Sequence, residues 1–256
     1  MGFTSEDHEK FKELRLTPLA EKFEELIADE SHDHQLPEEV FMAAVDHALD
    51  ARRSNKVDRL IKQAKFPLPS ASIAEIHYVP GRKLEESRMK RFATHQWRAD
   101  TTNLMVISAT GAGKTYLVCA IGIAACHTEH SVAYTRMDDL ARKLLIARND
   151  GVGHQDLLLK LCDVDLLIID DFLTVGIDQN VASDLFAILA ERENRLPTII
   201  ASQTDPSYWV QALPDRIAGE SIVNRLATNT RWIVLGNTDM RKLKHDEARA
   251  ATDYWE

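Results

Sequence analysis

One short stretch limits what this chain can fold into more than any other feature of its sequence. Residues 104–107 are an apolar run, small residues follow at 108–113, and after Lys114 a helical pattern runs from Thr115 to about His127. A strand, a small-residue loop ending in Gly-Lys-Thr and a helix form the layout of a phosphate-binding loop. Backbone N–H groups can surround a triphosphate only where small side chains let the backbone come close. The stretch therefore predicts a nucleotide-binding α/β fold.

The chemistry of phosphates assigns roles within this loop. We expect Lys114 to bridge the β- and γ-phosphates of ATP and the Thr115 hydroxyl to bind Mg²⁺. The usual pattern is G-x-x-x-x-G-K-[ST], but Ser108 stands in place of its first glycine. Serine fits the turn if its φ stays negative, so we expect a modest cost in affinity. The alternative is a strand–helix turn that binds nothing. The predicted nucleotide-binding residues are Ser108, Ala109, Thr110, Gly111, Ala112, Gly113, Lys114, Thr115 and Tyr116.

The amino-acid composition limits the kinds of protein that this chain can be. The 256 residues are 45% hydrophobic and 28% charged, as in ordinary globular proteins, and suffice for one large and one small domain. The net charge is -9, so any binding to nucleic acid must depend on local basic patches. Neither a membrane-spanning run nor a signal-peptide pattern is found, which favours a cytoplasmic protein with no membrane partner. Cys119, Cys126 and Cys162 lack metal-ligand spacing and are expected to be reduced core residues.

The pattern of the chain changes after residue 66. Residues 1–66 have helical periodicity, and the proline-rich stretch 67–72 interrupts it. We therefore expect an all-helical N-terminal domain over 1–66, a linker over 67–83 and the nucleotide-binding domain over 84–256. The long helix that Pro37 opens is basic in its distal half. This is typical of a solvated face or of a surface for DNA phosphates or an acidic partner.

Beyond the phosphate loop, apolar runs of strand length alternate with helical patterns. Further strands are expected at residues 131–135, 165–171, 198–203 and 231–235. Helices are expected at 84–98, 138–148 and 181–193, with further helical patterns between the last two strands. Such alternation predicts a parallel sheet with helices on both faces and ligands at the carboxyl ends of the strands.

Candidate catalytic groups follow the ends of these strands. Asp170 and Asp171 end the third strand, and Gln203 ends the fourth. We expect Asp170 to hold Mg²⁺ directly or through water, and Asp171 to orient or deprotonate the attacking water. Gln203 is placed to hydrogen-bond that water or the γ-phosphate. The simpler interpretation is that these residues are strand ends turning into solvent, and the phosphate loop upstream disfavours it.

In combination, these motifs resemble the IstB family, the AAA+ helper ATPases encoded beside the transposase of some bacterial insertion sequences. The chain is similar, more distantly, to DnaC-like helicase loaders. The resemblance covers nearly the whole chain, and it depends on the order and spacing of motifs that are individually short. They occupy residues 14–21, 110–115, 167–171, 198–203, 222–226 and 240–242.

The resemblance implies a P-loop AAA+ ATPase domain with a parallel five-stranded sheet, preceded by a small all-helical domain. It places Gln203 at the sensor position and Arg225 at the arginine finger, which completes the active site of a neighbouring subunit. Arg241 falls near the second sensor arginine. Asp171 stands where many AAA+ proteins have glutamate, and this shorter side chain implies slow hydrolysis.

The resemblance further implies a Mg-ATP-dependent regulator of transposition that assembles as a homo-oligomer on duplex DNA. Its partner would be the transposase encoded by the same element, docked on the helical N-terminal domain. Three other functions stay open: a helicase loader that prefers single-stranded DNA, a monomeric phosphotransferase, and a DNA-binding scaffold whose nucleotide is structural. Candidates for contacts with DNA phosphates, which a solvated helix face explains equally well, are Arg136, Arg142, Lys143 and Arg148.

Overall fold

The strand, loop and helix predicted around Lys114 are present in the computed structural model, which describes residues 3–32, 34–243 and 245. β1 (Asn103–Ile107) leads into the loop, and α5 (Lys114–His127) begins one residue before the predicted start at Thr115. Most of α5 is buried, because the helix lies against the sheet on one side and is covered by other segments on the other. The loop is thus held between two buried elements.

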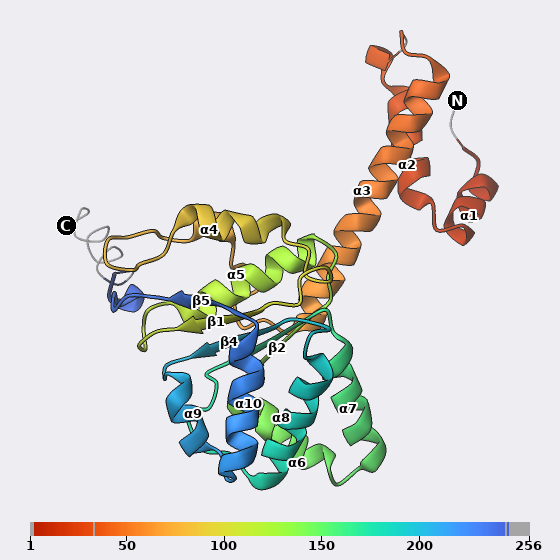
Figure 1. Ribbon diagram of the computed structural model, residues 1–256. Coiled ribbons are helices and arrows are strands. Elements are labelled where there is room, and N and C mark those ends of the chain that lie inside the picture. Colours follow the sequence, from red (N-terminus) through yellow and green to blue (C-terminus); the bar gives the residue numbers. More distant parts are fainter. Residues whose placement is uncertain (1–2, 33, 244, 246–256) are drawn as a thin grey trace. The chain divides into compact units, whose positions relative to one another are not determined.

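The strands form one parallel sheet in the order β2-β3-β4-β1-β5 (Figure 1). All five predicted strands are confirmed, with small shifts at their ends. The four beyond β1 are β2 (Val132–Arg136), β3 (Leu166–Asp170), β4 (Thr198–Ser202) and β5 (Thr230–Val234). Every residue of β3 and β4 is buried, as expected for central parallel strands covered on both faces.

Helices cover both faces of the sheet (Figure 1). One face carries α5, together with α4 (Glu86–Lys90) and the 3-10 helices η2 (Ile73–Glu75) and η3 (Arg91–Thr94). The other carries α6 (Met137–Ala147), α7 (Gly151–Asp163), α8 (Gln179–Arg192), α9 (Pro206–Ala212) and α10 (Arg216–Thr228). None of the helices described is both long and apolar enough to cross a membrane.

Two helices differ from expectation. The helix predicted over residues 84–98 is wrong in length, because α4 ends at Lys90 and a 3-10 turn replaces its second half. The Trp97 ring stacks on the Phe92 ring at a centroid distance of 5.8 Å. Trp97 is therefore buried although it lies in a turn and not in a helix. Helix α7 was not expected from the sequence, since Gly151 and Gly153 in its first turn are poor helix formers.

The N-terminal region is helical, as predicted. It contains α1 (Ser5–Glu13), α2 (Thr17–Ala28), the 3-10 helix η1 (Glu30–His32) and the beginning of α3 (Pro37–Ala64). Apolar side chains of α2 and α3 form a small core of their own, made of Leu19, Leu26, Val40, Ala44 and Ala48. This region therefore has the means to hold itself together.

The chain divides into two compact units between Arg59 and Leu60, inside α3, whereas the sequence analysis places the boundary at residue 66. The difference has a packing cause. Phe66 is buried in the core of the second unit, where it lies against Gly122 of α5. Residues 67–83, expected as a linker, also contribute buried side chains to that core, namely Ala71, Ile73 and Ile76.

All three cysteines are free and buried, in agreement with the prediction of reduced core residues. Burial raises the pKa of Cys119 and of Cys126 to about 12 and also raises that of Cys162. Because the thiolate is the reactive form, these side chains are inert packing residues.

A chain that starts at Leu60 should fold, whereas one that starts at Pro67 should be less stable by about 3–5 kcal/mol, because it lacks the aromatic ring of Phe66 in the core. Urea unfolding of the two truncated chains measures the difference. Phe66→Ala in the full chain is the control and should destabilise the second unit similarly. Equal stability of the two truncated chains would contradict the boundary inside α3.

Candidate nucleotide-binding site

The backbone of the phosphate loop has the conformation that its glycines allow. Gly111 and Gly113 have positive φ values of 88° and 84°, which glycine adopts without strain. Ser108 has no positive φ, so the condition for serine at the first position is met. Its backbone N–H donates to the carbonyl oxygen of Ser202 at 3.2 Å, which ties the start of the loop to the end of β4.

The Lys114 side chain is buried over the loop that precedes it. Its Nζ donates to the carbonyl oxygens of Ser108 and Ala109 at 2.9 and 3.0 Å. Burial lowers the pKa of Lys114, and the nearby carboxylates of Asp170 and Asp171 only partly offset this effect. Exchanging two neutral carbonyl partners for phosphate oxygens would stabilise this ammonium, since ionised acceptors make the stronger hydrogen bonds.

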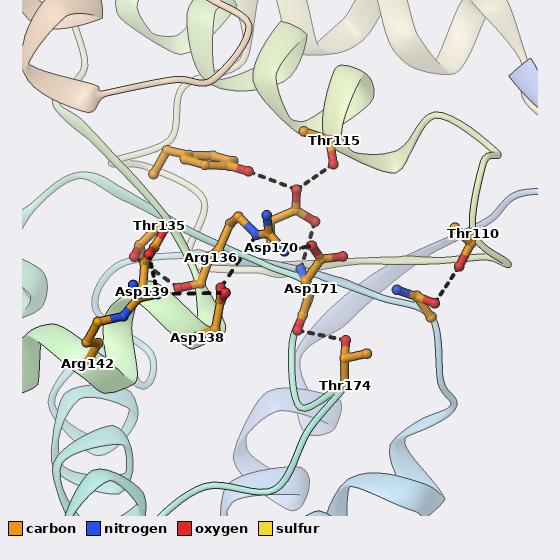
Figure 2. A network of polar contacts seen from close by, with 12 residues as sticks. Thr110, Thr115, Thr135, Arg136, Asp138, Asp139, Arg142, Asp170, Asp171 and Thr174 are labelled. Atoms are coloured by element: carbon orange, nitrogen blue, oxygen red, sulfur yellow. Dashed lines mark hydrogen bonds and ion pairs between the residues drawn. The ribbon is translucent and has the colours of Figure 1, made fainter. Parts of the chain in front are cut away.

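Asp170 is the most heavily bonded carboxylate of the site (Figure 2). Its Oδ2 accepts hydrogen bonds from Thr115 Oγ1 at 2.7 Å and from the Tyr134 hydroxyl at 2.9 Å. Its Oδ1 accepts one from the backbone N–H of Asp171 at 2.8 Å. Tyr134 is not among the predicted site residues, because its position inside β2 identifies it only as a strand residue. Burial and the charge of Asp170 raise the pKa of Tyr134, so its hydroxyl stays a donor.

The predicted metal ligands therefore lie together. The Thr115 and Asp170 oxygens are hard ligands of the kind that Mg²⁺ prefers. In the described part of the chain, no group of three or more His, Cys, Asp or Glu residues is arranged to hold a metal. In phosphate sites, Mg²⁺ is generally bound by one or two protein groups together with phosphates and water.

Asp171 directly follows β3, has a positive φ of 51°, and its side chain forms an ion pair (Figure 2). Its Oδ2 forms an ion pair with Arg136 Nη2 at 3.0 Å. Arg136 Nε also lies 3.5 Å from Asp138 Oδ1, so the guanidinium is shared between two carboxylates. The predicted water-activating residue is thus paired with one of the residues considered for DNA binding.

Gln203 lies beside the phosphate loop, as its place after β4 suggested. Its Oε1 accepts a hydrogen bond from Thr110 Oγ1 at 2.5 Å (Figure 2). This contact joins the loop after β1 to the end of the neighbouring strand.

The two predicted arginines differ in their surroundings. Arg241 lies near the loop, since its charge helps to lower the pKa of Lys114 and the adjacent Met240 N–H donates to the Gly111 carbonyl at 2.9 Å. Arg225 lies on α10, across the sheet from α5 (Figure 1). It pairs with Glu193, and its guanidinium carbon is 4.9 Å from the centroid of the Phe186 ring. Its described contacts do not include the phosphate loop of its own chain.

A second contribution to the site comes from residues that the sequence analysis assigned to a linker. Arg82 is only 2% exposed, and its Nη1 donates to the His77 carbonyl at 2.6 Å. If Gly113 carried a Cβ atom, that atom would lie 2.9 Å from Arg82 Nη2, and a Cβ atom on Gly236 would lie 1.7 Å from the Gly81 carbonyl oxygen. Both distances are too short for a side chain, so a substitution at either glycine would displace its neighbour. The backbone around Gly81 and Gly236 therefore packs closely beside the phosphate loop, a long-range contact that no local motif reveals.

Comparison with known proteins gives this arrangement a family. The model of the family described as IstB-like ATP binding protein matches residues 9–248. The chain belongs to this family. A Sinorhizobium fredii relative, named as an insertion-sequence ATP-binding protein (y4uH), is 29% identical over 234 residues, which cover 91% of this chain and 93% of that protein. One from Pseudomonas fluorescens, named as an ATP-binding protein of the insertion sequence IS1162, is 33% identical over 196 residues, or 76% and 84% of the two chains.

Solved structures support the same fold. DnaI superimposes on this IstB-like chain with a TM-score of 0.57 at 19% identity, covering 71% of this chain and 99% of DnaI. AMPPCP-bound DnaA from Aquifex aeolicus gives a TM-score of 0.56 at 20% identity, covering 68% and 52%. At such identities the likeness concerns the fold alone. The predicted P-loop AAA+ fold, with its five-stranded parallel sheet and helical N-terminal region, is confirmed.

Lys114→Ala should weaken ATP binding by more than about tenfold, because it removes the charge that opposes the β- and γ-phosphates. Isothermal titration calorimetry with a non-hydrolysable ATP analogue measures the change. Lys160→Ala, which removes an exposed lysine of α7, is the control and should bind like the parent. An affinity for Lys114→Ala within about threefold of the parent, near 0.65 kcal/mol, would contradict the assignment of the loop.

Proposed function

We propose that this IstB-like chain is a cytoplasmic, Mg-ATP-hydrolysing regulator of DNA transposition. It assembles as a homo-oligomer on duplex DNA and recruits or activates the transposase encoded by the same insertion element. The observation that carries the proposal is the hydrogen-bonded pair of Thr115 and Asp170 beside Lys114. It provides a nucleotide site in a chain whose relatives are named after insertion sequences and ATP binding.

ATP binding begins with the phosphate loop. The small residues from Ser108 to Gly113 present backbone N–H groups to the phosphates, and Lys114 exchanges its two carbonyl partners for phosphate oxygens. Thr115 and Asp170 would hold Mg²⁺, which when bound neutralises charge on the β- and γ-phosphate oxygens. Tyr134 keeps the Asp170 carboxylate oriented toward Thr115 through its hydroxyl.

Hydrolysis then requires a positioned water and stabilisation of developing charge. Asp171, next to Asp170, orients the water or accepts its proton. Gln203, held by Thr110, is the second polar group at the γ-phosphate end of the loop. Charge accumulates on the γ-phosphate oxygens in the transition state, and a guanidinium group neutralises it through paired hydrogen bonds. We assign that guanidinium to Arg225.

The position of Arg225 supports a role in trans. It lies in the helical layer across the sheet from its own α5, so it serves the γ-phosphate of a neighbouring subunit. In the single chain it is paired with Glu193, and assembly would exchange this carboxylate for a phosphate. Oligomer formation and hydrolysis are therefore coupled in this proposal.

Two further parts of the chain are assigned to macromolecular partners, one to the transposase and one to DNA. The helical unit of residues 1–59 has its own core and is the proposed docking site for the transposase. Among the basic residues considered for DNA, Arg142 pairs with Asp139 and Arg148 with Asp184. DNA phosphates must compete with these carboxylates for the guanidinium groups, which weakens any contact of DNA with Arg142 and Arg148.

Arg225→Ala should bind Mg-ATP almost normally yet hydrolyse it about ten- to a hundredfold more slowly, at the low end of the effect of arginine fingers. Mixing Arg225→Ala with Lys114→Ala subunits should restore part of the activity, because one supplies an intact nucleotide site and the other an intact arginine. The measurement is phosphate release at fixed total protein, with duplex DNA present, while the ratio of the two variants is changed.

A flat response at the sum of the two backgrounds, with assembly verified by light scattering, would reject the role in trans. A monomeric phosphotransferase would give the same flat response without assembly. Replacing duplex by single-stranded DNA tests the helicase-loader alternative, which predicts stronger stimulation by the single strand.

A further inference from the structure

Arg82 carries a buried charge that the proposed activity does not use. Its side chain is 2% exposed, its Nη1 donates to the His77 carbonyl at 2.6 Å, and its Nε is buried without a hydrogen-bond partner. Among the residues that the structure describes, no carboxylate forms an ion pair with its guanidinium. Burial lowers the pKa of Arg82, but an arginine side chain keeps its proton in proteins. A buried cation without a counterion destabilises the fold, and an anion that reaches it gains a strong partner.

The backbone holds Arg82 in place through an unusual turn. Gly81 and Lys83, on either side of it, have positive φ values of 84° and 54°. For a lysine this left-handed conformation is strained, and strain of this kind is concentrated at functional sites. The Gly236 N–H donates to the Arg82 carbonyl at 2.8 Å. Because Gly236 follows β5, which pairs with β1, the turn is fixed to the strand that carries the phosphate loop (Figure 1).

The guanidinium of Arg82 lies at the end of the phosphate loop. A Cβ atom on Gly113 would be 2.9 Å from Arg82 Nη2, and Tyr116 in the first turn of α5 is near enough to affect the pKa of Arg82. The first N–H groups of a helix have no partner within it and form the positive end of its dipole. Arg82 thus adds a second positive group at the beginning of α5, where one anion can satisfy both.

This position indicates which phosphates Arg82 reaches. Lys114 Nζ is bonded to the carbonyl oxygens of Ser108 and Ala109, at the beginning of the loop, and is the group expected at the β- and γ-phosphates. In loops of this kind, the backbone N–H groups surround the α- and β-phosphates. Arg82 lies beside Gly113 and the first turn of α5, so it is placed for the α- and β-phosphates and not for the γ-phosphate.

We propose that Arg82 is a further nucleotide-binding residue, whose guanidinium binds the α- and β-phosphate oxygens that ADP and ATP share. This inference rests on the proposed function, in which the phosphate loop binds Mg-ATP. It adds a charged group that holds substrate and product alike, in contrast to Arg225, which acts on the γ-phosphate. An arginine suits this position because it keeps its charge when buried and donates two parallel hydrogen bonds to a phosphate.

The alternative is that Arg82 only supports the segment of residues 77–82 through its bond to the His77 carbonyl. A neutral donor would serve that purpose without the cost of a buried charge. The low exposure of Arg82 does not argue against contact with a nucleotide, because Lys114 is enclosed to a similar extent, at 6% exposure. The two roles predict opposite effects of removing the charge on the stability of the nucleotide-free protein.

The test compares Arg82→Met with the parent in the full chain, by calorimetric titration with ADP and with a non-hydrolysable ATP analogue, each with Mg²⁺. Methionine is unbranched like arginine but carries no charge. Both affinities should fall by the same factor, about ten- to a hundredfold, the range expected for hydrogen bonds to a charged group. Urea unfolding without nucleotide should have a midpoint equal to or above that of the parent, because an unpaired buried charge has been removed.

Arg88→Met is the matched control. Arg88 is a partly buried arginine of α4 that also donates to a backbone carbonyl, that of Trp232, and its described contacts do not include the phosphate loop. This variant should bind both nucleotides like the parent. Arg82→Gln is the second test variant, since it keeps an N–H donor for the His77 carbonyl and removes only the charge. It should lose the same affinity, and it decides the question if Arg82→Met does not fold.

The inference is overturned if the folded Arg82 variants bind ADP and the ATP analogue within about threefold of the parent. A loss of affinity for the ATP analogue alone would place Arg82 at the γ-phosphate and overturn it as well. Weaker binding together with a lower urea midpoint in both variants would show a structural role instead. A parent chain that binds neither nucleotide would contradict the proposed function itself, and this inference with it.

Discussion

The buried carboxylate of Asp170 is the group on which the site depends. It is 1% exposed, and such a charge is tolerated only when hydrogen bonds replace its lost water. Its three donors come from α5, β2 and the end of β3, namely Thr115, Tyr134 and the Asp171 backbone. The Asp170 carboxylate thus fixes the beginning of α5, the edge strand β2 and the end of β3 relative to one another. Removing any one of the three donors leaves part of a buried charge without a hydrogen bond.

The charged residues assigned to catalysis are engaged within the single chain. Lys114 is bonded to loop carbonyls, Asp171 to Arg136, and Arg225 to Glu193. The partners of Lys114 and Arg225 are acceptors that a phosphate of ATP can replace, because a terminal phosphate is a stronger acceptor than a carbonyl and carries more charge than a carboxylate. In this account, ATP replaces the existing partners of Lys114 and Arg225, and assembly on DNA brings Arg225 to the nucleotide of the neighbouring subunit, so both ligands are needed for an active assembly.

The sequence predicts the elements that local pattern determines. The phosphate loop, the five strands and the acids after β3 are recognisable because each depends on neighbours in the chain. The Arg82 contact with the loop and the bond from Tyr134 to Asp170 were not predictable, because the residues involved are far apart in sequence. The division into compact units inside α3 was not predictable for the same reason: the prolines at 67–69 mark a turn, while Phe66 before them is buried in the second core.

The central claim, that nucleotide and duplex DNA together drive assembly, is tested most directly by the molar mass of the full chain in solution. Analytical ultracentrifugation should be run on the protein alone, with a non-hydrolysable ATP analogue and Mg²⁺, with duplex DNA, and with both. The account predicts large assemblies only when both ligands are present, and none for Lys114→Ala under the same conditions. A chain that stays monomeric with both ligands, or that assembles equally without nucleotide, would contradict it.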